Sequence, residues 1–104
     1  MSFVRACSLA DLAPGTALRV EVDGLDVAFV RDGDDVYAIE DECSHAAVAL
    51  SEGDVEGCEI ECWMHGSRFD LRTGKPTGPP ATEPVPIYPV QINGNDVLID
   101  LGDN

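Results

Sequence analysis

The sequence predicts an all-β domain built from antiparallel sheets, and three observations lead to that prediction. Short runs of alternating apolar and polar residues recur along the 104-residue chain, as at 18–22. Turn dipeptides separate these runs, among them the Asp-Gly pair at 23–24 and the Asn-Gly pair at 93–94, which are typical of tight hairpins. A helical pattern occurs as one short turn at 8–12, which a Pro-Gly pair ends.

The expected strands follow one another through short connections. They lie at 18–22, 27–30, 36–39, 59–61, 69–71, 88–92 and 97–99. A further turn is expected at 32–34. The strand at 36–39 leads directly into the segment that contains Cys43 and His45. This segment therefore starts from a rigid element.

Length and composition restrict the classes of function. One hundred and four residues suffice for a single domain, 1–104, and leave no room for a separate flavin or nicotinamide domain. No apolar run approaches the length of a membrane span, and the N-terminal residues lack the apolar segment of a signal peptide. We therefore expect a cytoplasmic protein whose four cysteines are reduced rather than paired in disulfides.

Acidic residues dominate the charge of the chain. Twenty aspartates and glutamates stand against six lysines and arginines, so the net charge is −14, and nucleic acid and anionic membranes are not expected partners. Eight acids cluster in the segment from 40 to 61, at Glu40, Asp41, Glu42, Glu52, Asp54, Glu56, Glu59 and Glu61. They form either a solvated surface that confers solubility or an electrostatic surface that steers basic partner proteins. Cations that could pair with them or shape that surface follow at Arg68, Arg72 and Lys75.

Two short segments each hold one cysteine and one histidine at a small offset. The chain has only two histidines, and each follows a cysteine within three residues, which packing alone does not explain. Thiolate and imidazole donors together suit iron or zinc, whereas magnesium or calcium would be bound through carboxylates. The sequence therefore predicts a metal centre whose four ligands are Cys43, His45, Cys62 and His65.

With these motifs and their surroundings, the chain resembles the Rieske-type ferredoxins. The likeness includes the segment at 65–70, the Thr-Gly pair at 73–74 and the prolines at 79–80, which in that family belong to a third loop over the cluster. The resemblance implies a Rieske-like antiparallel β-sandwich with a cluster-binding subdomain, about 41–82, inserted between the strands of the framework. It also implies one [2Fe–2S] cluster per chain, with the two cysteines on one iron and the two histidines on the other.

The resemblance also implies a function. Rieske ferredoxins of this kind pass single electrons from a ferredoxin reductase to a terminal non-haem iron oxygenase, such as a ring-hydroxylating dioxygenase of aromatic hydrocarbon catabolism. The two partners would dock near His45 and His65, the ligands of the outer iron. Because both histidines act as ligands, none is left as a general base, and we expect an electron-transfer component rather than an enzyme.

Two other functions stay open on the sequence. Rieske ferredoxins also serve iron–sulfur cluster assembly, and nothing in the chain separates that client from an oxygenase. Two cysteines and two histidines also form a common structural zinc site. Zinc motifs usually place cysteine near cysteine and histidine near histidine, whereas each segment here mixes the two, so zinc fits less well.

The remaining cysteines and the residues beside the ligands carry finer expectations. Cys7 and Cys58 are interpreted as strand or core residues and not as ligands. Val48 and Met64 stand near the places where high-potential Rieske proteins carry disulfide-forming cysteines, so the resemblance implies the low-potential branch. Trp63, next to Met64, either covers the cluster or packs as an ordinary apolar residue under its loop.

Overall fold

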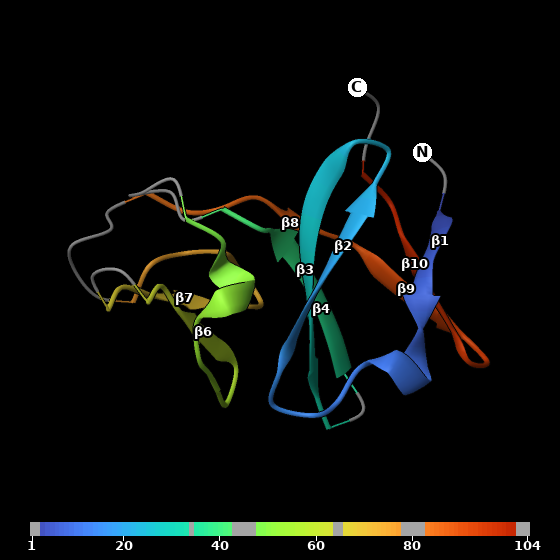
Figure 1. Ribbon diagram of the computed structural model, residues 1–104, viewed down its shortest axis with the longest axis horizontal. Helices are drawn as coiled ribbons and strands as arrows, with labels where there is room; N and C mark the ends of the chain where they lie inside the picture. Colours follow the sequence, from blue (N-terminus) through green and yellow to red (C-terminus); the bar gives the residue numbers. More distant parts are fainter. Residues whose placement is uncertain (1–2, 34, 43–47, 64–65, 78–82, 102–104) are drawn as a thin grey trace.

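The computed structural model describes residues 3–33, 35–42, 48–63, 66–77 and 83–101. Within them the chain forms ten strands and two short 3₁₀ helices, and every strand pair is antiparallel. The predicted all-β fold of antiparallel sheets is therefore confirmed (Figure 1).

The first sheet has the order β1-β10-β9, formed by Val4–Ser8, Asp96–Ile99 and Val90–Asn93. The second has the order β2-β3-β4-β8, formed by Ala17–Val22, Leu25–Asp32, Asp35–Glu40 and Ile87–Tyr88. The third has the order β5-β6-β7, formed by Val55–Glu56, Glu59–Glu61 and Arg68–Asp70.

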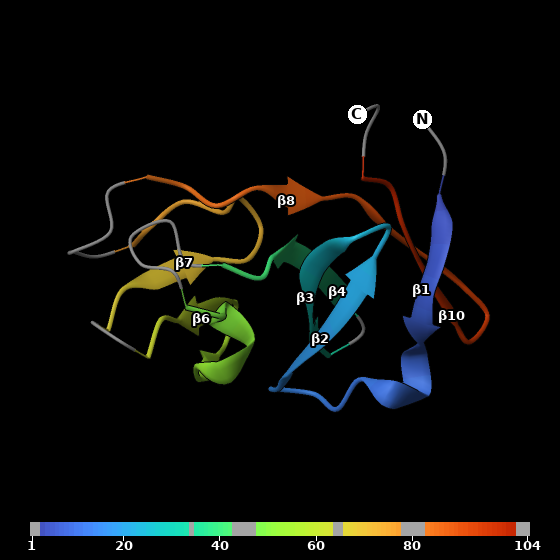
Figure 2. The same ribbon diagram turned by 45° about the horizontal axis from the view of Figure 1, so that its top comes forward.

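Strand β3 shows how the three sheets are layered. Successive side chains of a strand point to opposite faces, and here both faces are covered. Val27 and Phe29 belong to the core shared with the first sheet, whereas Ala28 and Val30 belong to the core shared with the third sheet. All four are fully buried. The second sheet thus lies between the other two, which is why this strand is continuously apolar (Figures 1 and 2).

The third sheet is built from residues that lie between two neighbouring strands of the second sheet. Strand β4 ends at Glu40, and β8 pairs with it through Ala38 opposite Tyr88 and Ile39 opposite Ile87. All of β5, β6 and β7 lies between these points in the chain. The segment that carries the predicted ligands therefore leaves the framework from one strand and returns to the adjacent one.

Two hairpin turns follow from glycine chemistry, and one of them is displaced from its expected place. Asp23 and Gly24 join β2 to β3 with φ angles of 50° and 83°, the pair of positive values typical of a type I′ turn. In the last hairpin, Asn93 is still paired with Asp96. The turn there begins at Gly94, with φ of 65°, so the expectation of an Asn93-Gly94 turn is wrong by one residue.

The expected single strand at 88–92 is divided by Pro89. Strand β8 ends at Tyr88 and pairs with β4 of the second sheet, whereas β9 begins at Val90 and pairs with β10 of the first. Proline has no N–H to donate to a ladder, so the pairing is interrupted where it occurs. The chain passes from one sheet to the other at this residue.

Smaller differences concern element ends and short elements. The helical turn expected at 8–12 is present as η1 (Leu9–Asp11). A second 3₁₀ helix, η2 (Leu50–Glu52), and strand β5 were not expected from the sequence. The strand expected at 69–71 lies one residue earlier. In the described part of the chain, no helix is both long and apolar enough to span a membrane.

Candidate metal centre

The second predicted ligand segment begins where β6 ends. Cys62 directly follows this strand, and its side chain is fully buried. It belongs to an apolar cluster that also contains Leu50, Ile60, Phe69, Leu71 and Val85. The cysteine is therefore held among apolar side chains, and its thiolate would be a soft ligand of the kind that suits iron or zinc.

Two backbone hydrogen bonds close the loop that Cys62 opens. Its N–H donates to the carbonyl oxygen of Ser67 at 2.6 Å, and the N–H of Gly66 donates to the carbonyl oxygen of Cys62 at 2.9 Å. Gly66 has a φ of 76°, in the left-handed region that glycine adopts without steric cost. The base of this loop is thus fixed beside β6 and β7. The predicted ligand His65 and its neighbour Met64 lie outside the described residues.

The first predicted ligand segment starts at the end of β4. Asp41 follows the strand, and its N–H donates to the carbonyl oxygen of Asp26 at 3.0 Å. The predicted ligands Cys43 and His45 lie outside the described residues, so the structure describes the two ends of this segment. Beyond it, Val48 packs against the same apolar cluster as Cys62. The ends of both ligand segments therefore meet at one core.

The segment with the prolines of the predicted third loop is also anchored at both ends. The N–H of Thr77 donates to the carbonyl oxygen of Arg68 at 2.8 Å, and the N–H of Val85 donates to that of Gly74 at 2.8 Å. A β-carbon at position 74 would overlap the carbonyl oxygen of Val85, so glycine is required for this approach as well as for its φ of 77°. Residues 78–82, which include these prolines, lie outside the described residues.

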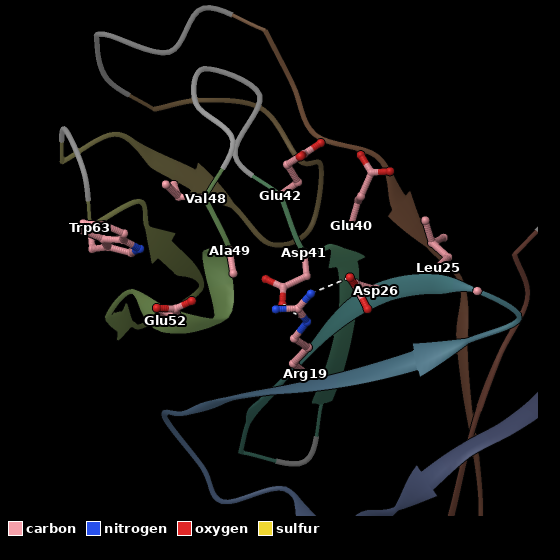
Figure 3. Close-up of a pocket in the computed structure, with 11 residues that line it drawn as sticks. Arg19, Leu25, Asp26, Glu40, Asp41, Glu42, Val48, Ala49, Glu52 and Trp63 are labelled. Atoms are coloured by element: carbon pink, nitrogen blue, oxygen red, sulfur yellow. Dashed lines mark hydrogen bonds and ion pairs between the residues drawn. The ribbon is translucent and has the colours of Figure 1, made fainter.

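An open groove of about 560 Å³ lies between the end of β4 and Trp63 (Figure 3). Its charged lining consists of one arginine and five carboxylates: Arg19, Asp26, Glu40, Asp41, Glu42 and Glu52. The Arg19 guanidinium lies between Asp26 and Asp41, hydrogen-bonded to the Asp26 carboxylate at 2.5 Å and with Nε 3.6 Å from Asp41 Oδ2. The bond to Asp26 raises the pKa of Arg19 above its usual value. The groove keeps an excess of negative charge.

Trp63 borders this groove and is not part of either core. The residue is 51% exposed, although it directly follows the fully buried Cys62. Of the two expectations for this residue, ordinary packing beneath a loop does not describe such an exposed ring. An exposed aromatic ring beside carboxylates can contact a cationic side chain of a partner protein.

The cations that follow the second segment pair locally. Arg68 lies 3.5, 3.8 and 4.0 Å from carboxylate oxygens of three acids of the third sheet: Glu56, Glu59 and Glu61. Asp70 accepts a hydrogen bond from the backbone N–H of Arg72 at 2.8 Å and lies 3.4 Å from its guanidinium, and these contacts lower the pKa of Asp70. The acids of the third sheet are thus partly neutralised, in contrast to those of the groove.

Sequence reasoning missed the structural part played by Asp41. From its place in the acidic segment Asp41 is expected at the surface. It is only 5% exposed, however, and its carboxylate accepts two hydrogen bonds from Ser51. The two residues are ten positions apart, and no local sequence pattern indicates that they pair. The pairing depends on η2, which the sequence did not reveal either.

Cys62 is the one predicted ligand that the structure describes. Cys7 lies in β1 within the core between the first two sheets, and Cys58 lies in the turn before β6, so neither opens a loop as Cys62 does. All three are free thiols. Within the described ranges, no three histidine, cysteine or acidic residues gather as a metal site, and the other three predicted ligands lie outside those ranges.

Comparison with known proteins shows which family and which proteins this chain is similar to. A family model described as the Rieske [2Fe-2S] domain matches residues 2–89. The biphenyl dioxygenase ferredoxin subunit of Pseudomonas sp. (strain KKS102) is 42% identical over 101 residues, which are 96% of this chain and 93% of that relative. The ferredoxin of carbazole 1,9a-dioxygenase from Nocardioides aromaticivorans IC177 is similar in structure, with a TM-score of 0.91 and 44% identity over 95% of this chain and 97% of that one. A chain in a solved complex of reduced oxygenase and oxidised ferredoxin in carbazole 1,9a-dioxygenase has a TM-score of 0.87 and 38% identity, over 93% of this chain and 91% of that one.

Proposed function

The chain belongs to the Rieske [2Fe-2S] domain family, and from this membership we propose that it carries single electrons to the terminal oxygenase of a multicomponent dioxygenase. One observation carries the proposal: the chain matches ferredoxin subunits along almost their whole length, 93% of the biphenyl dioxygenase subunit and 97% of the carbazole dioxygenase ferredoxin. Ferredoxin subunits transfer electrons and do not themselves oxidise the substrate. The chain is accordingly an electron-transfer component and not an enzyme.

We propose that Cys43 and Cys62 bind one iron of a [2Fe–2S] cluster and that His45 and His65 bind the other, as the family resemblance implies. When bound, the cluster supplies a one-electron couple. The buried Cys62 and the hydrogen-bonded base of its loop support this assignment, because a ligand held in place requires little rearrangement when the charge of the centre changes.

The partners in this proposal are a ferredoxin reductase as donor and the terminal oxygenase as acceptor. The solved complex of oxygenase and ferredoxin in carbazole 1,9a-dioxygenase supports an oxygenase as acceptor. Docking would occur near His45 and His65, and the acidic groove that ends at Trp63 supports docking of basic partner surfaces on this side of the molecule. We propose a cytoplasmic location, as expected from the sequence.

The comparisons also favour one client over the alternatives. The named relatives belong to dioxygenases of biphenyl and carbazole, which supports an aromatic hydrocarbon pathway rather than iron–sulfur assembly. The match to a [2Fe-2S] family likewise disfavours a structural zinc module.

Electron paramagnetic resonance of the anaerobically purified protein, recorded after reduction with dithionite, tests the cluster assignment. We expect a rhombic signal whose average g value lies below that of the free electron. Protein that contains stoichiometric zinc, lacks iron and gives no signal would instead be a structural module.

Substitution of single ligands then tests the residues. Cys62→Ser, Cys43→Ser and His65→Ala should each abolish the signal and the visible absorption of the cluster. Cys7→Ala is the matched control, because Cys7 lies in the core between the first two sheets, and this variant should retain the cluster. Cys58→Ala should also retain it, because Cys58 lies in the turn before β6 and is not a predicted ligand. Retention of the absorption bands by Cys62→Ser or His65→Ala would show that the ligand set is different.

A further inference from the structure

Asp41 stands out among the acids of the cluster-bearing side because its carboxylate is completely withdrawn from solvent. Its side chain has 0% exposure. Its two oxygens accept hydrogen bonds from the same residue: Oδ1 from the backbone N–H of Ser51 at 2.7 Å, and Oδ2 from the hydroxyl of Ser51 at 2.6 Å. Hydrogen bonds to a carboxylate are short and stronger than those between neutral groups. Asp41 is therefore a fixed internal group and not a surface charge.

The two paired residues flank the first predicted ligand segment. Asp41 precedes Cys43 by two positions, and Ser51 follows His45 by six. Joining residues 41 and 51 therefore holds the two described ends of this segment close to each other. The β4 side of the closure is itself attached to the framework, because the N–H of Asp41 donates to the carbonyl oxygen of Asp26.

On the Ser51 side, η2 and the residues after it contact the second ligand segment. Ser51 is the middle residue of η2, whose first residue, Leu50, is fully buried in the same apolar cluster as Cys62. Directly after η2, Gly53 lies so close to the carbonyl group of Glu61 that no β-carbon would fit between them, and Glu61 donates its N–H to the carbonyl oxygen of Asp54 at 2.8 Å. Glu61 immediately precedes Cys62. Through η2, one rigid connection links the ends of both ligand segments.

Arg19 compensates the buried charge. Its Nε lies 3.6 Å from Asp41 Oδ2, while its other end is bonded to Asp26 (Figure 3). The arginine side chain is 51% exposed and borders the groove, whereas the Asp41 side chain has no exposed surface. A buried carboxylate is retained only when hydrogen bonds and a counter-charge offset its desolvation, and Asp41 has both.

We propose that Asp41 is a positioning residue that, through Ser51, fixes the two ends of the segment bearing Cys43 and His45 relative to Cys62. This inference rests on the ligand assignment of the proposed function. Asp41 does not bind the cluster, and it does not act as a docking charge. Aspartate suits the positioning role because its one carboxylate accepts hydrogen bonds from both the N–H and the hydroxyl of Ser51. A longer glutamate at the end of β4 could not form both bonds without displacing the backbone.

Asp41→Ala tests the proposal, with iron release to a chelator and the electron paramagnetic resonance spectrum of the reduced protein as readouts. We expect release to be about 10-fold faster or more, as for other residues that orient metal ligands, together with shifted or broadened g values. Asp41→Asn should restore most of the wild-type behaviour, because its amide oxygen can accept from the Ser51 N–H and its amide N–H can donate to the Ser51 hydroxyl oxygen.

Asp100→Ala is the matched control. Asp100 is an aspartate that is equally buried, 4% exposed against 5% for Asp41, but it follows β10 in the first sheet. Its substitution should lower thermal stability while leaving the spectrum and the rate of iron release unchanged. If both alanine variants alter the spectrum alike, Asp41 acts only through general stability and the proposal is wrong.

Two further outcomes are distinguishable. If Asp41→Ala fails to fold, Ser51→Ala removes only the hydroxyl bond, and a wild-type spectrum and release rate for that variant would overturn the proposal. A wild-type protein without any iron signal would refute the proposed function itself. A normal wild-type signal that Asp41→Ala leaves unchanged would refute only the positioning role.

Discussion

Gly53 lies against the carbonyl group of Glu61, the residue that precedes Cys62. A β-carbon at position 53 would overlap this carbonyl oxygen. The φ of Gly53 is −88°, which any residue can adopt, so the close approach and not the backbone conformation requires glycine. The end of η2 and the end of β6 are thereby in direct contact.

Gly53→Ala should disturb this contact and with it the position of Cys62. Inserting a methyl group into a closely packed site costs about 1–3 kcal/mol, and here the backbone beside a predicted ligand must move to admit it. We expect a lower midpoint of thermal unfolding and a lower iron content per chain. Gly33→Ala, in the β3–β4 connection, is the control: its site is open but its φ is 63°, so it should cost about 1–2 kcal/mol without loss of iron. Wild-type iron content in Gly53→Ala would contradict the close approach.

The two cores can be separated by one matched pair of substitutions. Ile60 and Ile99 are both fully buried, but Ile60 packs with Cys62 whereas Ile99 packs between the first two sheets. Ile60→Val and Ile99→Val should each lower stability by about 0.5–1.5 kcal/mol. Only Ile60→Val is expected to accelerate iron release to a chelator at temperatures well below global unfolding. Equal acceleration in both variants would mean that the two cores open as one unit.

The pH dependence of Tyr37 reports on the contact between the framework and the third sheet. Its hydroxyl donates a hydrogen bond to Cys58, and this bond, together with desolvation, raises the pKa of Tyr37 to about 12. Because the folded pKa lies above the ordinary value of 10, the neutral phenol stabilises the fold below pH 10, and this contribution is lost between about pH 10 and 12.

Cys58→Ala should therefore lower the pKa of Tyr37 toward its ordinary value. The measurement is the ultraviolet absorbance of tyrosinate during a pH titration. It is made in a Tyr88→Phe background, because burial also raises the pKa of Tyr88. An unchanged titration midpoint in Cys58→Ala would show that the thiol is not the partner of Tyr37.

Charge reversal in the groove tests the proposed docking surface. Glu52→Lys places a second cation in the groove lining that also contains Arg19 and Trp63, which should weaken association with a basic partner. We expect a several-fold slower electron transfer from the reductase at low ionic strength, with the difference shrinking as salt screens the charges. Asp35→Lys, at the opposite end of β4 from Glu40, is the control for net charge. Equal effects of both variants, or rates that do not respond to salt, would argue against steering by the groove.

Local patterns in the sequence were enough to predict most strands and turns and the type of centre. Alternation of apolar and polar residues with a period of two indicates a strand with one buried face. The Asp-Gly pair at 23–24 favours a tight hairpin turn because both residues adopt positive φ angles there. The motifs that hold Cys43, His45, Cys62 and His65 likewise predict a metal centre, and the resemblance to Rieske ferredoxins predicts its family. These features depend on neighbours within a few positions.

The sequence by itself determined the all-β class, the candidate ligands and their family, while the tertiary structure decided how the sheets are connected and which acids are structural. Alternation continues across Pro89, so only the pairing of β8 with β4 and of β9 with β10 reveals that the chain changes sheets there. In the sequence Asp41 is one of eight clustered acids, and only the structure shows that η2 places Ser51 within hydrogen-bonding distance of it. Burial and hydrogen bonding between distant positions are set by which surfaces the fold brings together, and a one-dimensional pattern carries no record of that contact.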